Sequence, residues 1–131
     1  MIVLDSSAAL DYLLGADTLA AWVEHQLDAA EWNLHASYVI DIEVFAVVRA
    51  RVLSKSMTSR RGHAVLDVFA GFPLRRYPHV QLFERMWSLR EHVSTPDASF
   101  VALAEALNAP LVTTDLRLSR AHGIRTTIVA P

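Results

Sequence analysis

Apolar positions along this chain form short continuous runs and longer stripes with helical periodicity, and the two kinds of segment alternate. The short runs predict strands at residues 2–4, 33–36, 74–77, 111–113 and 126–129. The longer stripes predict helices at residues 6–14, 17–27, 38–53, 58–69, 80–92, 96–107 and 116–122. Because the strands are mostly apolar and alternate with helices, the pattern predicts a parallel sheet in a three-layer α/β domain.

Composition limits the kinds of protein that this pattern can represent. The 131 residues suit one domain spanning 1–131, and the hydrophobic fraction of 53% suits a sheet covered on both faces or a surface hidden against a partner. No apolar run reaches the roughly 18 residues of a membrane span, no secretory signal is visible, and the absence of cysteine agrees with a cytosolic protein. The net charge of -2 argues against a broadly basic nucleic-acid binder.

Asp5 and Asp115 each follow an apolar strand run at the point where a helix begins. An aspartate in that position can simply cap the helix. It can also belong to a binding site, because open parallel sheets bind ligands at the carboxyl ends of their strands. For each residue taken alone, both interpretations stay open.

Glu43 is harder to explain as a surface residue. At about 100° per residue, its side of the helix is shared by Val39, Ala46, Val47 and Ala50. Asp41 points the opposite way and is expected to be solvated. A buried carboxylate is costly unless it is neutralised, paired or bound to a metal. We therefore expect a metal near Glu43, with a buried ion pair to an arginine as the alternative.

Asp97 falls in the first turn of the helix at 96–107, where Thr95 is the expected N-cap and the helix dipole favours an acid. Its side of the helix is apolar, so Asp97 is expected to point inward at the end of the sheet; the residues on that side are Phe100, Val101 and Ala104. Carboxylates gathered in this way repel one another unless a cation binds between them. Oxygen ligands alone select a hard cation such as Mg²⁺ or Mn²⁺.

The same residues form a pattern that resembles a known family. The pattern consists of Ile-Val-Leu-Asp5-Ser-Ser7, Asp-Ile-Glu43-Val followed by Arg49, Pro-Asp97-Ala-Ser-Phe-Val-Ala-Leu-Ala-Glu-Ala-Leu, and Leu-Val-Thr113-Thr-Asp115. It is similar to the PIN domain, and more specifically to VapC, the ribonuclease toxin of VapBC toxin–antitoxin pairs. The resemblance runs from residue 2 to the C-terminus.

The resemblance implies a five-stranded parallel sheet flanked by helices, in which the strands ending at Asp5 and Asp115 are neighbours at the switch in strand order. It also implies an Mg²⁺-dependent endoribonuclease that cuts a tRNA or rRNA loop. A cognate VapB antitoxin would silence this enzyme, and homodimers and toxin–antitoxin hetero-oligomers are expected.

On this basis we expect metal-assisted phosphodiester hydrolysis. The expected metal ligands and catalytic residues are Asp5, Glu43, Asp97 and Asp115. Ser7 and Thr113 are expected to orient carboxylates through hydrogen bonds. The candidates for contact with the substrate phosphates are Arg49, Arg51, Arg90 and Arg117.

Two other functional classes remain as alternatives. A phosphatase or phospho-acceptor domain could use Asp5 as a nucleophile, although Ser7 stands where one such phosphatase class needs an Asp, and the one Lys, Lys55, is distant in sequence. The second alternative is a catalytically weak PIN scaffold that only binds antitoxin or RNA. It arises because Pro96 and Phe100 stand where the family often has Tyr.

Overall fold

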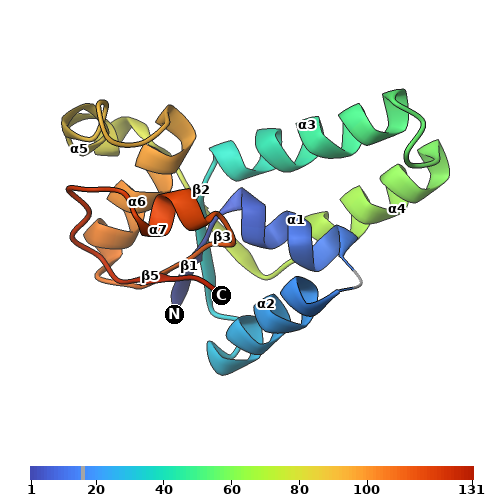
Figure 1. Cartoon of the computed structure of the whole chain (residues 1–131), viewed down its shortest axis with the longest axis horizontal. Coiled ribbons are helices and arrows are strands. Elements are labelled where there is room, and N and C mark those ends of the chain that lie inside the picture. The colour runs from blue at the N-terminus through green and yellow to red at the C-terminus, as the bar shows by residue number, and fades with distance from the viewer. Residues whose placement is uncertain (16) are drawn as a thin grey trace.

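The computed structural model describes residues 1–15 and 17–131 and contains a parallel sheet of five strands (Figure 1). The strands are β1 (Ile2–Leu4), β2 (Leu34–Ser37), β3 (Leu74–Tyr77), β4 (Leu111–Val112) and β5 (Ile128–Val129). They lie in the order β3-β2-β1-β4-β5, and each neighbouring pair is parallel. The predicted sheet is therefore confirmed, and the strand order switches between β1 and β4, as the resemblance implied.

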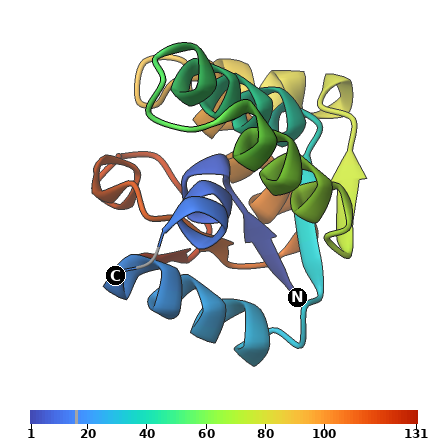
Figure 2. The same ribbon diagram turned by 90° about the vertical axis from the view of Figure 1, so that its right-hand side faces the viewer.

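Helices cover both faces of this sheet. They are α1 (Ser6–Leu14), α2 (Thr18–Ala29), α3 (Val39–Leu53), α4 (Ser59–Ala70), the 3-10 helix η1 (Val80–Leu82), α5 (Phe83–Ser88), α6 (Thr95–Leu107) and α7 (Leu116–Ser119). Helices α1 and α2 lie on one side of the sheet and α5 and α6 lie on the other, while α3 and α4 pair with each other and pack against α1 (Figures 1 and 2). In the part of the chain that the structure describes, no helix has the length and apolarity needed to cross a membrane.

Helix α6 lies at the centre of the core. All of its residues from Ala98 to Ala104 are buried, because it packs on β1, β2 and β4 on one side and on α5 on the other. Small residues let the helix approach the sheet closely, and Phe100, which is fully buried, fills the space that remains. The prediction that the Asp97 side of this helix faces the core is therefore confirmed.

Three predicted boundaries are wrong in instructive ways. The helix predicted at 80–92 ends at Ser88, because the chain turns there and places Leu89 fully in the core. Helix α6 begins one residue early, because Ser94 rather than Thr95 is the N-cap and accepts the Asp97 N–H. The helix predicted at 116–122 ends at Ser119. The hydrophobic pattern does not mark the ends at Ser88 and Ser119, and Ser94 and Thr95 are both of residue types favoured at an N-cap.

Candidate active site

Asp5 follows β1 directly and is only 2% exposed. Its Oδ1 accepts hydrogen bonds from the Ser7 Oγ at 2.7 Å and from the Ala8 backbone N–H at 2.9 Å, so Asp5 is the N-cap of α1. Burial raises the pKa of the Asp5 carboxyl from 3.8 to about 6. Hydrogen bonds from its neighbours oppose that rise in pKa, and the charge of Asp97 adds to it.

A hydrogen-bond chain joins Asp5 to the end of β4. Ser7 Oγ lies 3.2 Å from Thr113 Oγ1 and accepts the Thr114 N–H at 3.1 Å. Thr113 Oγ1 in turn accepts the Asp115 N–H at 3.0 Å. Because β1 and β4 are paired neighbours, this chain fixes the two strand ends relative to each other. Ser7 thus donates to the Asp5 carboxylate, whereas Thr113 contacts the backbone rather than the carboxylate of Asp115.

Glu43 lies near the start of α3, but not in the middle of its buried stripe. That stripe consists of Ile40, Val44 and Val48, whereas Ala46 and Ala50, predicted to share the buried side, are exposed. Helix α3 is apolar on several sides, so periodicity could not show which side meets the core. Glu43 is half-buried at the edge of the stripe and accepts a hydrogen bond from Ser6 Oγ at 2.8 Å.

The electrostatic setting of Glu43 still differs from that of a surface acid. Burial raises the pKa of its carboxyl, the Ser6 hydrogen bond opposes this rise, and the charge of Asp97 adds to it. The arginine partner considered as an alternative is not found, since none of the ion pairs among residues 1–15 and 17–131 includes Glu43. The prediction that Asp41 is merely solvated is wrong, because Arg76 Nε donates to both of its carboxylate oxygens at 2.9 Å.

Asp97 and Asp115 have opposite shifts in pKa. Burial raises the pKa of the Asp97 carboxyl, with Ser94 opposing and the charge of Asp115 adding to the rise. Asp115 caps α7 and forms an ion pair with Arg117 at 3.0 Å, and this guanidinium holds the pKa of Asp115 below its usual value. The Arg117 side chain is 93% exposed, so it covers the Asp115 carboxylate from the solvent side.

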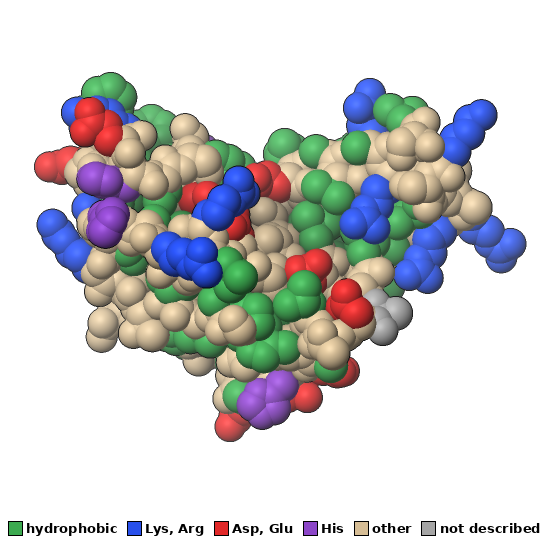
Figure 3. Space-filling model, viewed as in Figure 1, with side chains coloured by type: hydrophobic (Ala, Val, Ile, Leu, Met, Phe, Trp, Pro, Cys, Tyr) green, Lys and Arg blue, Asp and Glu red, His purple; other side chains and the backbone are tan. Residues whose placement is uncertain are grey.

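Asp97 is the electrostatic centre of the group. Its charge acts on Asp5 and on Glu43, and the charge of Asp115 acts on Asp97. Acidic side chains lie in the hollow middle of the face in Figure 3, between the α5–α6 side and the α3–α4 side. Within the described ranges, no three of these side chains are already arranged to hold a metal ion.

The predicted arginines lie in different surroundings. Arg117 lines a cavity of about 260 Å³ together with Asp97 and Asp115. Arg49 and Arg51 are exposed on α3, about 9 and 12 Å along the helix axis from Glu43. Arg90 stacks on the ring of Trp87. Of the four, the structure brings Arg117 directly to the acidic residues.

Two further polar side chains line the cavity of Asp97 and Asp115 and were not predicted to do so. They are His92 and Ser94, which precede α6. Ser94 could have been recognised as a helix cap, since serine is favoured at that position. His92 gave no such signal, because its place beside the acids depends on the turn after α5, which the hydrophobic pattern did not reveal.

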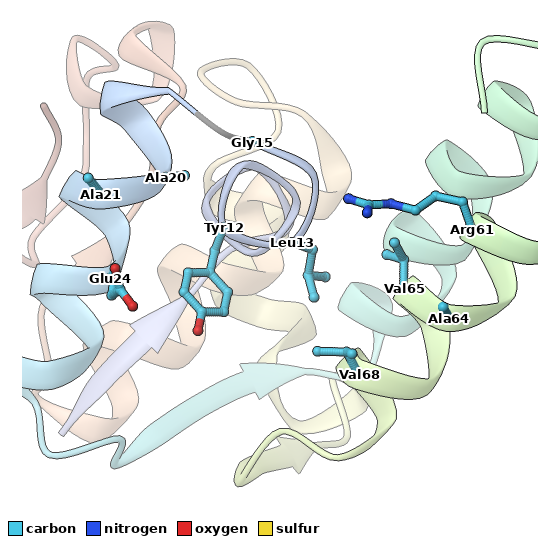
Figure 4. Close-up of a pocket in the computed structure, with 10 residues that line it drawn as sticks. All are labelled: Tyr12, Leu13, Gly15, Ala20, Ala21, Glu24, Arg61, Ala64, Val65 and Val68. Atoms are coloured by element: carbon cyan, nitrogen blue, oxygen red, sulfur yellow. The ribbon is translucent and has the colours of Figure 1, made fainter. Parts of the chain in front are cut away.

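A second cavity, of about 450 Å³, lies between α1, α2 and α4 (Figure 4). Val65 and Val68 of α4 point toward Leu13 of α1, and small residues of α2 complete the wall. Arg61 extends from α4 toward α1, and Glu24 of α2 lies on the other side of the cavity. The acids described above do not line it, so it is a separate cavity of mixed polar and apolar lining.

Comparison with known proteins places the chain in a family. Residues 2–124 match the PIN domain. The chain is 45% identical over 119 residues to a VapC ribonuclease of Mycobacterium bovis, which covers 91% of this chain and 89% of that protein.

Solved structures show the same fold. VapBC2 from Rickettsia felis, bound to a DNA fragment from its promoter, superposes with a TM-score of 0.73 at 18% identity, over 99% of this chain and 98% of that one. VapC20 of Mycobacterium tuberculosis, described as a toxin that cleaves the sarcin–ricin loop, gives a TM-score of 0.71 at 16% identity, over 95% and 97% of the two chains. The chain therefore belongs to the PIN-domain family and, within it, to the VapC ribonucleases.

Proposed function

We propose that this chain is an Mg²⁺-dependent endoribonuclease toxin that cuts a structured RNA, such as a tRNA or rRNA loop, and that a VapB-type antitoxin neutralises it. One observation carries the proposal: a buried aspartate at the end of β1 shares its surroundings with Asp97, which also acts on Glu43 and lies beside Asp115. The VapC ribonuclease that is 45% identical supports RNA as the substrate class.

The donor set fits a hard divalent cation. Burial and mutual repulsion raise the pKa values of Asp5, Glu43 and Asp97, so each carboxylate would be stabilised by a cation between them. We propose that Asp5, Glu43, Asp97 and Asp115 hold Mg²⁺, with Mn²⁺ as a substitute, because all four offer only oxygen ligands. When bound, such an ion supplies a Lewis acid at the phosphodiester and a means of activating water.

The surrounding residues position these groups. Ser7 holds the Asp5 carboxylate through its hydroxyl, and Thr113 restrains the backbone at Asp115. Arg117 uses Nε and one terminal nitrogen on Asp115, so its remaining N–H groups can donate to a substrate phosphate. Pro96 lies in the first turn of α6, where a proline is readily accommodated, so the helix that carries Asp97 is formed normally.

Helix α3 carries an exposed apolar surface made by Tyr38, Ile42 and Phe45, and Ile42 is 71% exposed. The spacing of these residues puts them on one side of the helix. Exposed apolar side chains grouped in this way mark an interaction surface. We propose that a second copy of the chain covers them in a homodimer.

The cavity between α1, α2 and α4 suits a different partner. It combines apolar side chains such as Leu13, Val65 and Val68 with polar ones, and Arg61 lies at its edge. Among the described residues, the ion pairs do not include Arg61, so an acidic group on a partner could pair with it. We propose that an apolar segment of the antitoxin, carrying an acidic residue, binds there.

The first prediction concerns cleavage. In the protein freed of antitoxin, Asp5→Asn, Glu43→Gln and Asp97→Asn should each reduce Mg²⁺-dependent cutting of total RNA by about 100-fold or more, because each removes a proposed ligand. The matched control is Asp41→Asn, on the same helix as Glu43 but paired with Arg76. Cutting should be measured on gels with Mg²⁺ or EDTA. Full activity in the three site variants would contradict the proposed metal site.

The second prediction concerns pH. The folded pKa of Asp5, about 6, lies above its ordinary value of 3.8, so its contribution to stability is present below pH 3.8 and is lost as pH rises through 6. In EDTA, Asp5→Asn should therefore unfold at higher urea concentration than the parent at pH 7. The advantage, up to about 3 kcal/mol, should shrink toward pH 4. Mg²⁺ should raise the melting temperature of the parent more than that of the variant. If the difference in stability between Asp5→Asn and the parent does not change with pH, the raised pKa of the buried Asp5 carboxyl is wrong.

The third prediction concerns the antitoxin. Ala64→Trp should fill the cavity between α1, α2 and α4 and weaken binding of the cognate antitoxin at least about ten-fold, measured by calorimetry. The control is Ala70→Trp, an exposed position near the end of the same helix that does not line the cavity. Equal affinities for the two variants would place the antitoxin elsewhere.

The fourth prediction concerns assembly. Ile42→Glu should convert the homodimer into a monomer in light scattering, because a charge would then lie in the proposed apolar contact. Leu53→Glu, at an exposed apolar residue at the other end of α3, is the control and should stay dimeric. A parent protein that is already monomeric would rule out the dimer.

A further inference from the structure

Trp87 is an exposed aromatic residue beside the acidic site. It lies on α5, and 69% of it is accessible to solvent. An indole ring offers a large rigid apolar surface, and proteins that bind single-stranded nucleic acid use such rings for stacking. The proposed function does not otherwise use this residue.

Arg90 adds a positive charge beside the indole of Trp87. Its guanidinium lies over the Trp87 ring, 4.6 Å from the ring centroid. Arg90 also donates a hydrogen bond to the Trp87 backbone carbonyl at 3.0 Å, which holds the guanidinium in place. The contact leaves further N–H groups of Arg90 available to a phosphate. Trp87 and Arg90 together form what we call the α5 platform.

The α5 platform borders a cavity that adjoins the acidic site. This cavity, of about 600 Å³, is lined by the two platform residues and by Thr95 and Ala98 of α6. Thr95 and Ala98 flank Asp97 in the first turn of the same helix. Val93 lines both this cavity and the smaller one that contains Asp97 and Asp115. A ligand leaving the acids along this side would therefore meet the platform next.

We infer that an unpaired nucleobase of the RNA stacks on the α5 platform, one step along the strand from the phosphate held at the acidic residues. The inference rests on the proposed ribonuclease function. The base would lie against Trp87 in the apolar cavity, and Arg90 would contact the adjoining phosphate. Glu84, the acid that lines this cavity, offers only acceptors and would bind N–H groups on the edge of the base.

Charge favours RNA over an apolar protein partner at this surface. A purely hydrophobic contact would have to desolvate Arg90, which is exposed, and Glu84 at the wall of the cavity. A nucleotide satisfies both, because it presents a flat apolar face, an anionic phosphate and N–H donors in one unit. The volume also lies within the range of small-ligand pockets.

The experiment measures RNA binding without cutting. In an Asp5→Asn background, a fluorescent 12-nucleotide single-stranded RNA of mixed sequence is titrated in Mg²⁺ and followed by anisotropy. Trp87→Leu should weaken binding about ten-fold and Trp87→Phe much less, because phenylalanine keeps a ring for stacking. Placing a single abasic nucleotide along the RNA should identify one position whose loss weakens the parent but not Trp87→Leu.

A matched arginine tests the charge. Arg90→Ala should weaken binding, whereas Arg75→Ala should not, although Arg75 stacks on Tyr77 in a similar way on the edge strand β3. If Trp87→Leu binds the RNA within two-fold of the parent affinity, base stacking on the α5 platform is wrong while the nuclease proposal stands. If the parent protein, with cutting prevented by EDTA, and the Asp5→Asn protein both bind no RNA, both proposals fail. If Trp87→Leu changes the mass in light scattering and not the affinity, the surface is an interface between copies.

Discussion

The parallel pairing of β1 with β4 is the constraint on which the rest of the site depends. Because the strand order switches between these two neighbours, the chain leaves their carboxyl ends in different directions. No connection has to cross the space above them, and Asp5 and Asp115 come to face it. The hydroxyls of Ser7 and Thr113 then join the two strand ends by hydrogen bonds. Without that pairing, the two aspartates would be unrelated helix caps.

Helices α6 and α3 carry the other two acids, Asp97 and Glu43. Helix α6 is held by the core along Ala98 to Ala104, so its first turn, with Asp97, has a fixed position at the end of the sheet. Helix α3 contacts the core along a narrow stripe, and Glu43 lies at the edge of that stripe. Asp97 is therefore the common neighbour: burial raises the pKa of both Asp5 and Glu43, and the charge of Asp97 adds to that rise. The fold holds like charges together, at a cost that the buried apolar contacts offset.

Capping a helix and serving a site are compatible roles here. Asp5 accepts the Ala8 N–H, and Asp115 accepts the Arg117 N–H, so both are N-caps. Each uses Oδ1 for the cap. Asp5 thus keeps its second carboxylate oxygen, whereas the Asp115 Oδ2 is engaged by Arg117. For Asp5, the structural and the functional interpretations therefore describe different atoms of the same side chain.

The sequence by itself determined the sheet, the alternation of strands and helices, and the positions of the four acids relative to strand and helix ends. These depend on local hydrophobic pattern and capping chemistry, which involve residues close together in the chain. Only the tertiary structure decided which side of α3 is buried, where the segment after α5 turns, and that Trp87 lies beside the acidic site. Helix α3 is apolar on more than one side, and no glycine or proline marks the turn after Ser88. Both features were settled by packing between segments far apart in the chain, and that packing leaves no local signal.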